Sequence, residues 1–250
     1  MPVTIRDGWM SGDATPVPAE GLYLGPEGPT QILMPTRQYA VEAYRAPAIP
    51  ERCKLTRGAV ANYARSKWGP AATDTPWSPA GPAYDAVRGQ LEALLSHKFW
   101  GRFEVIGSLV HLALPRQEAA VTIDLVVRFD DGGGLGLVDV WPGPPRKTTE
   151  VPQAWRERAQ GSEGLTEALR LMDQAISKAP QEQRAAWAEL GAGVAALADA
   201  RIPVEKAVVV WSGPTGVQLE AKPAQEALDA WVDAVSLARA YRLGFGRKNT

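Results

Sequence analysis

Two aspartates in neighbouring predicted strands are the residues of this sequence best suited to chemistry. Asp124 lies in residues 119–129, where apolar residues alternate with others as in a β-strand, and Asp139 lies in a second such stretch, residues 135–141. Asp131-Gly132 between them is typical of a two-residue hairpin turn, because glycine tolerates a positive φ angle. With the turn centred there, paired residue numbers sum to 263, which places Asp124 directly opposite Asp139.

The expected pairing would bring two carboxylates close enough to share a proton or a cation. Directly opposite residues of antiparallel strands have Cβ atoms about 4.5–5.5 Å apart. Carboxylates at that distance repel each other unless a proton or a cation lies between them. The glycines after Asp131 could instead carry a longer loop, and a slip of one residue would place Asp124 opposite Val140 on the wrong face. Alternatively, either aspartate could cap a turn or pair with an arginine such as Arg128.

Length, charge and the scarcity of cysteine and histidine exclude several classes of protein. The 250 residues allow one large or two small domains, and a formal net charge of −1 provides no overall basic field that would attract nucleic acid. Cys53 is the only cysteine, which excludes an internal disulfide and a cysteine-based zinc site. His97 and His111 are the only histidines, too few for a histidine-rich metal centre or for most Ser-His-Asp arrangements.

The sequence also predicts where the protein works and which side chains would contact partners. No apolar run is long enough to span a bilayer, and the first ten residues lack the basic and apolar regions of a signal peptide. We therefore expect a cytoplasmic protein without a membrane contact. Nine tryptophans are many for this length, and several are expected to anchor the core or an interface. An interface made by exposed tryptophans would produce a homo-oligomer or a complex with another protein.

The elements before the aspartates predict a short arm followed by one larger domain. Residues 1–50 are rich in proline and glycine and are expected to form an extended, weakly regular arm or a small hairpin that packs on the main body. Residues 51–250 are expected to form a single α/β domain. A helix predicted over residues 83–98 precedes a strand over residues 103–114 that bends near Gly107. With the two strands that carry the aspartates, this gives three consecutive strands, most simply an antiparallel meander.

Beyond the meander, the pattern predicts helices on both sides of one further strand. Helices are expected after Ser162 and after Pro180, a strand over residues 204–212, and a last helix over residues 224–241. A strand that is reached through helices after a meander implies a mixed sheet with helices on its faces. The predicted fold class is therefore α/β, with an antiparallel three-strand meander flanked by helices.

The segments around both aspartates resemble the motifs of a known superfamily. VTIDLVV at residues 121–127 and LVDVWPG at residues 137–143 are similar to the pattern Ile-Asp with an apolar run, an acidic-Gly turn, and then Leu-Val-Asp-x-Lys-x-Gly. This pattern is typical of the PD-(D/E)XK nucleases, and the similarity is greatest to their RecB-type and phage exonuclease branches. The resemblance covers about residues 83–211 and implies a restriction-endonuclease-like mixed sheet.

The resemblance also implies roles for individual residues. In the family the two acids hold one or two Mg²⁺ ions, so Asp124 and Asp139 would be ligands of Mg²⁺ or Mn²⁺. A helix before the meander often adds a glutamate, and Glu92 stands at that place here, unless it is a solvated helix residue. A helix after the meander usually carries Gln-x-x-x-Tyr, where this chain has Glu189 and Gly193.

The chain departs most clearly from the family pattern at the lysine that orients or activates the attacking water. Trp141 stands two residues after the second acid, where the family has that lysine, and an indole can neither carry a charge nor transfer a proton to water. Lys147 is the nearest candidate for a relocated lysine, with Arg146 and Arg128 as cationic stand-ins. Loss of the lysine would lower the rate by a factor on the order of 10²–10⁴.

The function that the resemblance predicts is a Mg²⁺-dependent DNA nuclease with a relocated or missing lysine. Asp124, Asp139 and Lys147 would be its catalytic residues, with Glu92 joining the two aspartates as a metal ligand. The alternative is a catalytically inactive relative that binds nucleic acid or another protein as a regulatory or structural subunit. The intact acidic pair favours the nuclease, whereas Trp141 and the near-neutral charge favour the inactive relative. A metal-dependent hydrolase of a smaller phosphate ester is a third option.

Overall fold

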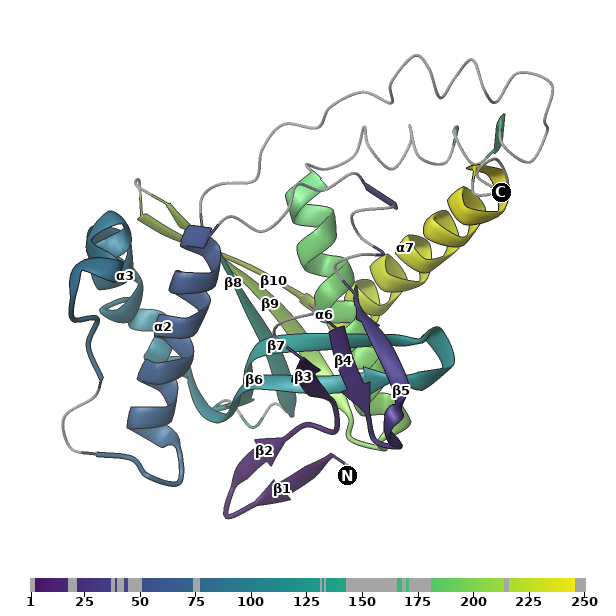
Figure 1. Ribbon diagram of the computed structural model, residues 1–250. Coiled ribbons are helices and arrows are strands. Elements are labelled where there is room, and N and C mark those ends of the chain that lie inside the picture. Colours follow the sequence, from purple (N-terminus) through teal and green to yellow (C-terminus); the bar gives the residue numbers. More distant parts are fainter. Residues whose placement is uncertain are drawn as a thin grey trace.

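The fold is a mixed α/β arrangement built around one large sheet. The computed structural model describes residues 3–17, 22–36, 39, 43, 44, 51–73, 77–130, 132, 134–142, 166, 167, 170, 181–213 and 216–245. Within them, an eight-stranded mixed sheet is accompanied by four α-helices and a separate two-stranded sheet (Figure 1). The predicted α/β class with a mixed sheet is thus confirmed.

The strands of the large sheet come from both ends and the middle of the chain. They are β3 (Thr15–Val17), β4 (Leu22–Gly25), β5 (Gly28–Pro35), β6 (Phe103–Leu114), β7 (Ala119–Phe129), β8 (Leu135–Pro142), β9 (Val204–Gly213) and β10 (Gly216–Pro223). Strands β1 (Thr4–Arg6) and β2 (Trp9–Ser11) form the small sheet. The α-helices are α2 (Glu51–Trp68), α3 (Arg88–Leu95), α6 (Gln181–Asp199) and α7 (Ala224–Phe245), and the 3₁₀ helices are η1 (Pro82–Val87), η2 (Lys98–Arg102) and η3 (Pro115–Gln117). None of the described helices is long and apolar enough to cross a membrane.

The predicted meander is present, and its register is the predicted one. Strands β6, β7 and β8 pair antiparallel in chain order, and β9 then pairs parallel to β8. The β7–β8 pairs run from Leu125 opposite Val138 to Arg128 opposite Leu135, each summing to 263. The two-residue turn is wrong, however, because β7 ends at residue 129 and β8 begins at residue 135. The longer glycine loop connects the strands without changing the register.

Three other predictions on local structure have mixed outcomes. The bend of β6 near Gly107 is confirmed by a register shift between Val105 and Gly107. The helix over residues 83–98 is interrupted, because the segment after Pro82 forms the 3₁₀ helix η1 before α3 begins. The N-terminal segment is more regular than expected, since β3, β4 and β5 extend the large sheet and β5 pairs parallel to β7.

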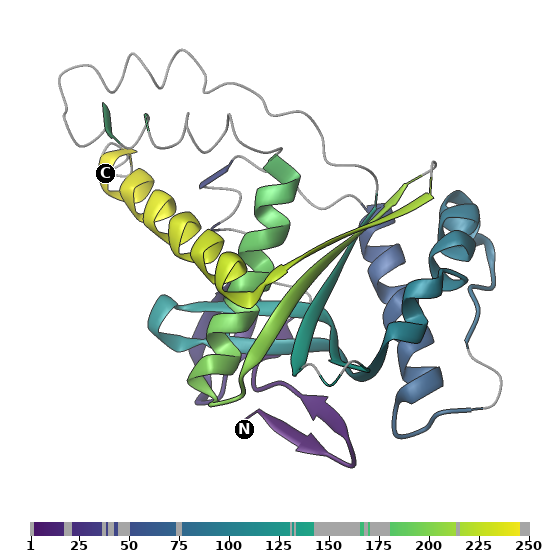
Figure 2. The same cartoon turned by 180° about the vertical axis from the view of Figure 1, so that it is seen from behind.

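Helices cover both faces of the sheet and bury two separate layers of apolar side chains. Helices α2 and α3 lie on one face, and α6 and α7 lie on the other (Figures 1 and 2). The layer under α2 and α3 includes Val60, Ala64, Leu94, Phe99, Leu125, Val127, Val138 and Val140. The layer under α6 and α7 includes Val121, Ile123, Val126, Leu137, Trp141, Leu190, Val209 and Trp231.

The contact between α6 and α7 depends on a glycine, and this makes a first prediction. A Cβ atom at Gly191 would lie 1.9 Å from the carbonyl oxygen of Ala227 and 2.9 Å from the Cβ of Trp231, so α7 would have to move. We expect Gly191→Ala to lower the free energy of unfolding by about 1–3 kcal/mol in urea denaturation, despite the better helix propensity of alanine. Gly58→Ala in α2 is the matched control, because a Cβ there would meet nothing within 4 Å. Equal stability of the two variants would contradict this close packing.

Candidate functional site

The two aspartates lie where β7 changes from one neighbouring strand to another. We call this place the fork: it is residues 121–124 of β7, between the pairing with β5 and the pairing with β8. One edge of β7 pairs with β6 from residue 119 to residue 129, with a break at Asp124, which has no partner in β6. The other edge pairs with β5 at residues 119 and 120 and with β8 from residue 125 onward. Between these two pairings, the backbone of β7 has no strand partner on that edge. The fork therefore needs side chains to complete its hydrogen bonds, since buried backbone groups without partners are costly.

The fork also interrupts the alternation of side chains along β7. Val121 and Ile123 belong to the layer under α6, but Leu125 and Val127 belong to the layer under α2. The strict alternation predicted for the whole strand is therefore wrong at Asp124, where the strand changes the face that its odd-numbered residues present. The ladder with β6 is interrupted at the same place, because Asp124 has no partner there and Leu109, which would lie opposite it, has a positive φ of 46°.

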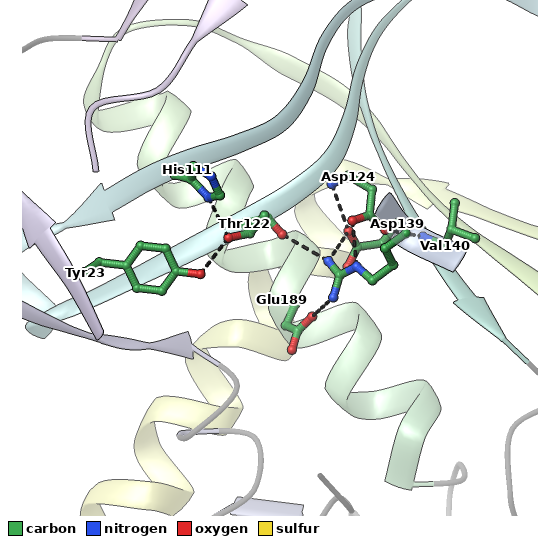
Figure 3. A network of polar contacts seen from close by, with 8 residues as sticks. Tyr23, His111, Thr122, Asp124, Asp139, Val140 and Glu189 are labelled. Carbon is green, nitrogen blue, oxygen red and sulfur yellow. Dashed lines mark hydrogen bonds and ion pairs between the residues drawn. The ribbon is translucent and has the colours of Figure 1, made fainter. Parts of the chain in front are cut away.

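Asp124 and Asp139 face each other at the fork and join the backbones of β7 and β8 (Figure 3). The backbone N–H of Asp124 donates to Oδ1 of Asp139 at 3.3 Å, and the backbone N–H of Val140 donates to Oδ2 of Asp124 at 2.8 Å. Both aspartates are fully buried. The two carboxylates thus take over the hydrogen bonding of the ladder where the β7–β8 pairs end.

Arg57 of α2 supplies the positive charge at this pair. Its Nε donates to Oδ1 of Asp124 at 2.6 Å, and its Nη2 donates to Oδ1 of Asp139 at 3.3 Å. The same Nη2 donates to the carbonyl oxygen of Thr122 at 3.2 Å, which satisfies another backbone group of the fork. The side chain of Arg57 is only 12% exposed, so these contacts are shielded from water and stronger than a surface ion pair.

Glu189 of α6 approaches the guanidinium from the other face of the sheet. Its Oε2 lies 3.8 Å from Nη1 of Arg57, and the residue is buried (Figure 3). Arg57 therefore links α2 to α6 through the fork. We call Arg57, Asp124, Asp139 and Glu189 the acid–arginine cluster.

The cluster holds more negative than positive charge. Burial raises the pKa of Asp124 and raises that of Asp139 well above the ordinary value, although Arg57 opposes both shifts. Burial disfavours the charge of Arg57, but the three nearby acids more than offset it and hold its pKa well above the ordinary value. Three ionised acids and one guanidinium would leave a net charge of −2. A proton on Asp139 is the simplest way to lower this excess, because its pKa is raised the most strongly.

One oxygen of the cluster is buried without a partner. Oδ2 of Asp139 is shielded from solvent and has no hydrogen-bond partner among the described residues. An unpaired buried carboxylate oxygen is costly when it is ionised and much less so when it is protonated. This observation agrees with a proton on Asp139.

A Mg²⁺ ion does not fit the cluster in this arrangement. Mg²⁺ needs near-octahedral oxygen ligands and usually keeps several waters, whereas both aspartates are fully buried. Of their four carboxylate oxygens, all but Oδ2 of Asp139 already accept hydrogen bonds. Within the described ranges, no group of at least three His, Cys, Asp or Glu residues could hold a metal ion.

The other predicted site residues that the structure describes do not join the pair. Glu92 lies exposed on α3, and no described hydrogen bond or ion pair links it to either aspartate. Trp141 is buried, with its ring centroid 6.1 Å from that of Trp211. Arg128 pairs with Glu104 at 3.0 Å on the surface rather than with an aspartate. Lys147 lies outside the described residues, as does Arg146.

The sequence places Arg57 on a basic side of a helix that could touch phosphate or be solvated, and its contact with the aspartates and with Glu189 was missed, although a signal for both residues was present. Arg57 precedes Val60 by three residues and Ala64 by seven, so it continues a buried helix stripe. Glu189 follows Ala185 by four residues and precedes Ala192 by three in the same way. A charged residue within an apolar stripe indicates a buried partner of opposite charge.

A second polar group adjoins the fork on the side of the N-terminal strands. The hydroxyl of Thr122 lies 2.8 Å from the Tyr23 hydroxyl and 2.8 Å from Nδ1 of His111 (Figure 3). Burial, with a smaller effect from Arg65, lowers the pKa of His111, which favours the neutral ring near pH 7. Thr122 thus connects β4 and β6 to the strand that carries Asp124.

Comparison with protein-family models and with curated proteins gives no match for this chain.

Proposed function

We propose that this protein is a non-catalytic binding or regulatory protein in which Arg57 takes the place that Mg²⁺ occupies in the PD-(D/E)XK nucleases that the sequence resembles. The bond from Arg57 to both aspartates carries the proposal. A guanidinium bound to two carboxylates supplies permanently the positive charge that a nuclease takes from its metal ion.

The surroundings of the aspartates support an inactive site. Phosphodiester hydrolysis by a metal requires that water and a phosphate oxygen reach the ion. Both aspartates are fully buried, and the indole of Trp141 packs in the layer under α6 at the position of the family's lysine. A phosphate group and its attacking water would therefore have no access to these two carboxylates, and an indole stands where the family has its lysine.

The proposal also explains why an inactive site retains two facing acids. Where β7 and β8 stop pairing, the Asp124 carboxylate accepts from the backbone N–H of Val140. The Asp139 carboxylate accepts from the backbone N–H of Asp124. Loss of either carboxylate would leave buried N–H groups of the fork without partners, at a cost of about 1–3 kcal/mol each. The pair thus stabilises the fold, whether or not it ever served catalysis.

Two observations bear on what such a protein would bind. The net charge of −1 gives no overall attraction for DNA. All eight tryptophans in the described part of the chain are buried or half-buried, so this part offers no fully exposed tryptophan to a partner.

A Mg²⁺-dependent DNA nuclease is the second candidate, favoured by the excess negative charge of the cluster. Oδ2 of Asp139 has no partner among the described residues, and the acids outnumber the guanidinium three to one. This candidate requires Arg57 to leave the pair. Lys147 remains its candidate for the lysine and DNA its substrate.

The two candidates predict opposite results with metal and DNA. We expect calorimetric titration with Mn²⁺ to give no binding heat, because the carboxylates are bonded to Arg57. We also expect linear and single-stranded DNA to remain intact with Mg²⁺ or Mn²⁺. Any residual cleavage rate should equal that of an Asp139→Asn control. Stoichiometric Mn²⁺ binding together with cleavage that Asp139→Asn abolishes would overturn the proposal and establish the nuclease. Cleavage that persists in Asp139→Asn would identify a contaminating enzyme.

A further inference from the structure

A cavity lies on the sheet face shared with α2 and α3, at the end of the strands away from α3. Its volume is about 680 Å³, and its walls come from η2 and from strands β6, β7, β9 and β10. Gln90 of α3 bonds the carbonyl oxygen of Ser212 at 2.7 Å, which places α3 over the far end of β9. The cavity occupies the sheet surface that α3 does not reach.

The walls of the cavity are mainly apolar and include an aromatic side. The rings of Phe99 and Phe103 have centroids 5.7 Å apart, and those of Phe103 and Phe129 have centroids 6.2 Å apart. Leu219 of β10 lines the opposite side and is 42% exposed, a high value for a leucine. Rings that pack on one another form a rigid wall, so little order is lost when a ligand binds there.

The charges at the cavity favour an anion. Arg102 and Lys206 line it together with a single acid, Asp130. The Nζ atom of Lys206 lies 4.8 Å from the centroid of the Phe129 ring, so the cation lies directly beside the aromatic wall. A ligand with an apolar body and a terminal carboxylate would place each part against a matching surface.

We propose that this cavity binds a small amphipathic anion, a carboxylate with a medium-chain alkyl or aryl body. The volume lies within the range of about 300–1,000 Å³ that is usual for small-molecule sites. The apolar body would cover Leu219 and the phenylalanines, and the carboxylate would lie between Arg102 and Lys206. This inference does not depend on the acid–arginine cluster, because the cavity and the cluster share no residue.

The test is calorimetric titration of the full chain with decanoate and, separately, with decanol. We expect one decanoate site, and we expect decanol, which lacks the charge, to bind about tenfold more weakly. Lys206→Glu should lower the decanoate affinity by about tenfold or more, since it replaces an attraction with a repulsion. Arg102→Glu, at an exposed position, should act in the same direction and serves if Lys206→Glu does not fold.

Matched controls separate a built site from general attraction to the surface. Arg88→Glu changes the charge of the chain equally but lies on α3, outside the cavity, and should leave the decanoate affinity unchanged. An equal loss of affinity in Arg88→Glu, equal binding of decanol, or no binding of decanoate at all would overturn the proposal. The proposal would also be overturned if decanoate did not bind but a single-stranded oligonucleotide did, with an affinity that Lys206→Glu lowers. The cavity face would then bind nucleic acid.

Discussion

Replacing Arg57 with methionine is expected to lower the free energy of unfolding by about 3–5 kcal/mol at neutral pH. Methionine preserves much of the apolar volume of the side chain but removes the guanidinium that contacts Asp124, Asp139 and Glu189. Removal of one partner of a buried ion pair leaves the remaining charges unpaired in a poorly solvated place. The carbonyl oxygen of Thr122 also loses its donor. Urea denaturation followed by tryptophan fluorescence measures the change.

Arg65→Met is the matched control on the same helix. Arg65 donates to the side chain and the carbonyl oxygen of Ser108 at 3.0 and 3.3 Å, so its partner is neutral. We expect this control to cost about 0.5–1.5 kcal/mol, as for an ordinary hydrogen bond. If Arg57→Met costs no more than Arg65→Met, Arg57 does not compensate buried charge and the acid–arginine cluster loses its structural role.

The loss in Arg57→Met should be partly reversed by a second substitution. Asp124→Asn in the same chain removes the charge that Arg57 contacts at 2.6 Å, so the double variant should be more stable than Arg57→Met alone. The gain must exceed the effect of Asp124→Asn in the wild-type chain. Equal effects in the two backgrounds would show that the two residues do not interact.

The position of the acidic pair could be predicted from the sequence because its determinants are local. The predicted turn places the centre of the hairpin correctly, and a loop that is longer by the same number of residues on both sides leaves the sum of the paired numbers at 263. The alternation of side chains along β8 also places Leu137 in the layer under α6 and Val138 in the layer under α2. Short-range pattern therefore accounts for the part of the site that lies in one hairpin.

The partners of the pair could not be predicted because they depend on long-range packing. Arg57 reaches Asp124 across 67 residues of sequence, and only the packing of α2 on the sheet decides that its side chain turns inward. The alternative that an aspartate pairs with an arginine holds for Arg57. It does not hold for Arg128, which pairs with Glu104 at the surface. The parallel pairing of β5 with β7 is equally non-local, and it is this pairing that creates the fork.

Asp139→Asn is expected to make the protein progressively more stable than the wild type as the pH rises. Burial raises the pKa of Asp139 well above its ordinary value of 3.8 in the folded protein, whereas the unfolded chain ionises near that value. Between these two pKa values the folded wild type holds a proton that the unfolded chain has released. The stability that depends on this proton is complete below about pH 3.8 and is lost as the pH rises toward the folded pKa.

The difference in unfolding free energy between Asp139→Asn and the wild type should therefore increase by about 1.4 kcal/mol for each pH unit within that window. Urea denaturation of both proteins from about pH 4.5 to about pH 8 measures the slope. Glu104→Gln is the control, because Glu104 is exposed and paired with Arg128, and its difference from the wild type should stay nearly constant. A constant difference for Asp139→Asn as well would mean that Asp139 is ionised in the folded protein. Its unpartnered oxygen would then be a free anionic ligand, and the nuclease candidate would gain the metal-binding atom that the proposed function denies it.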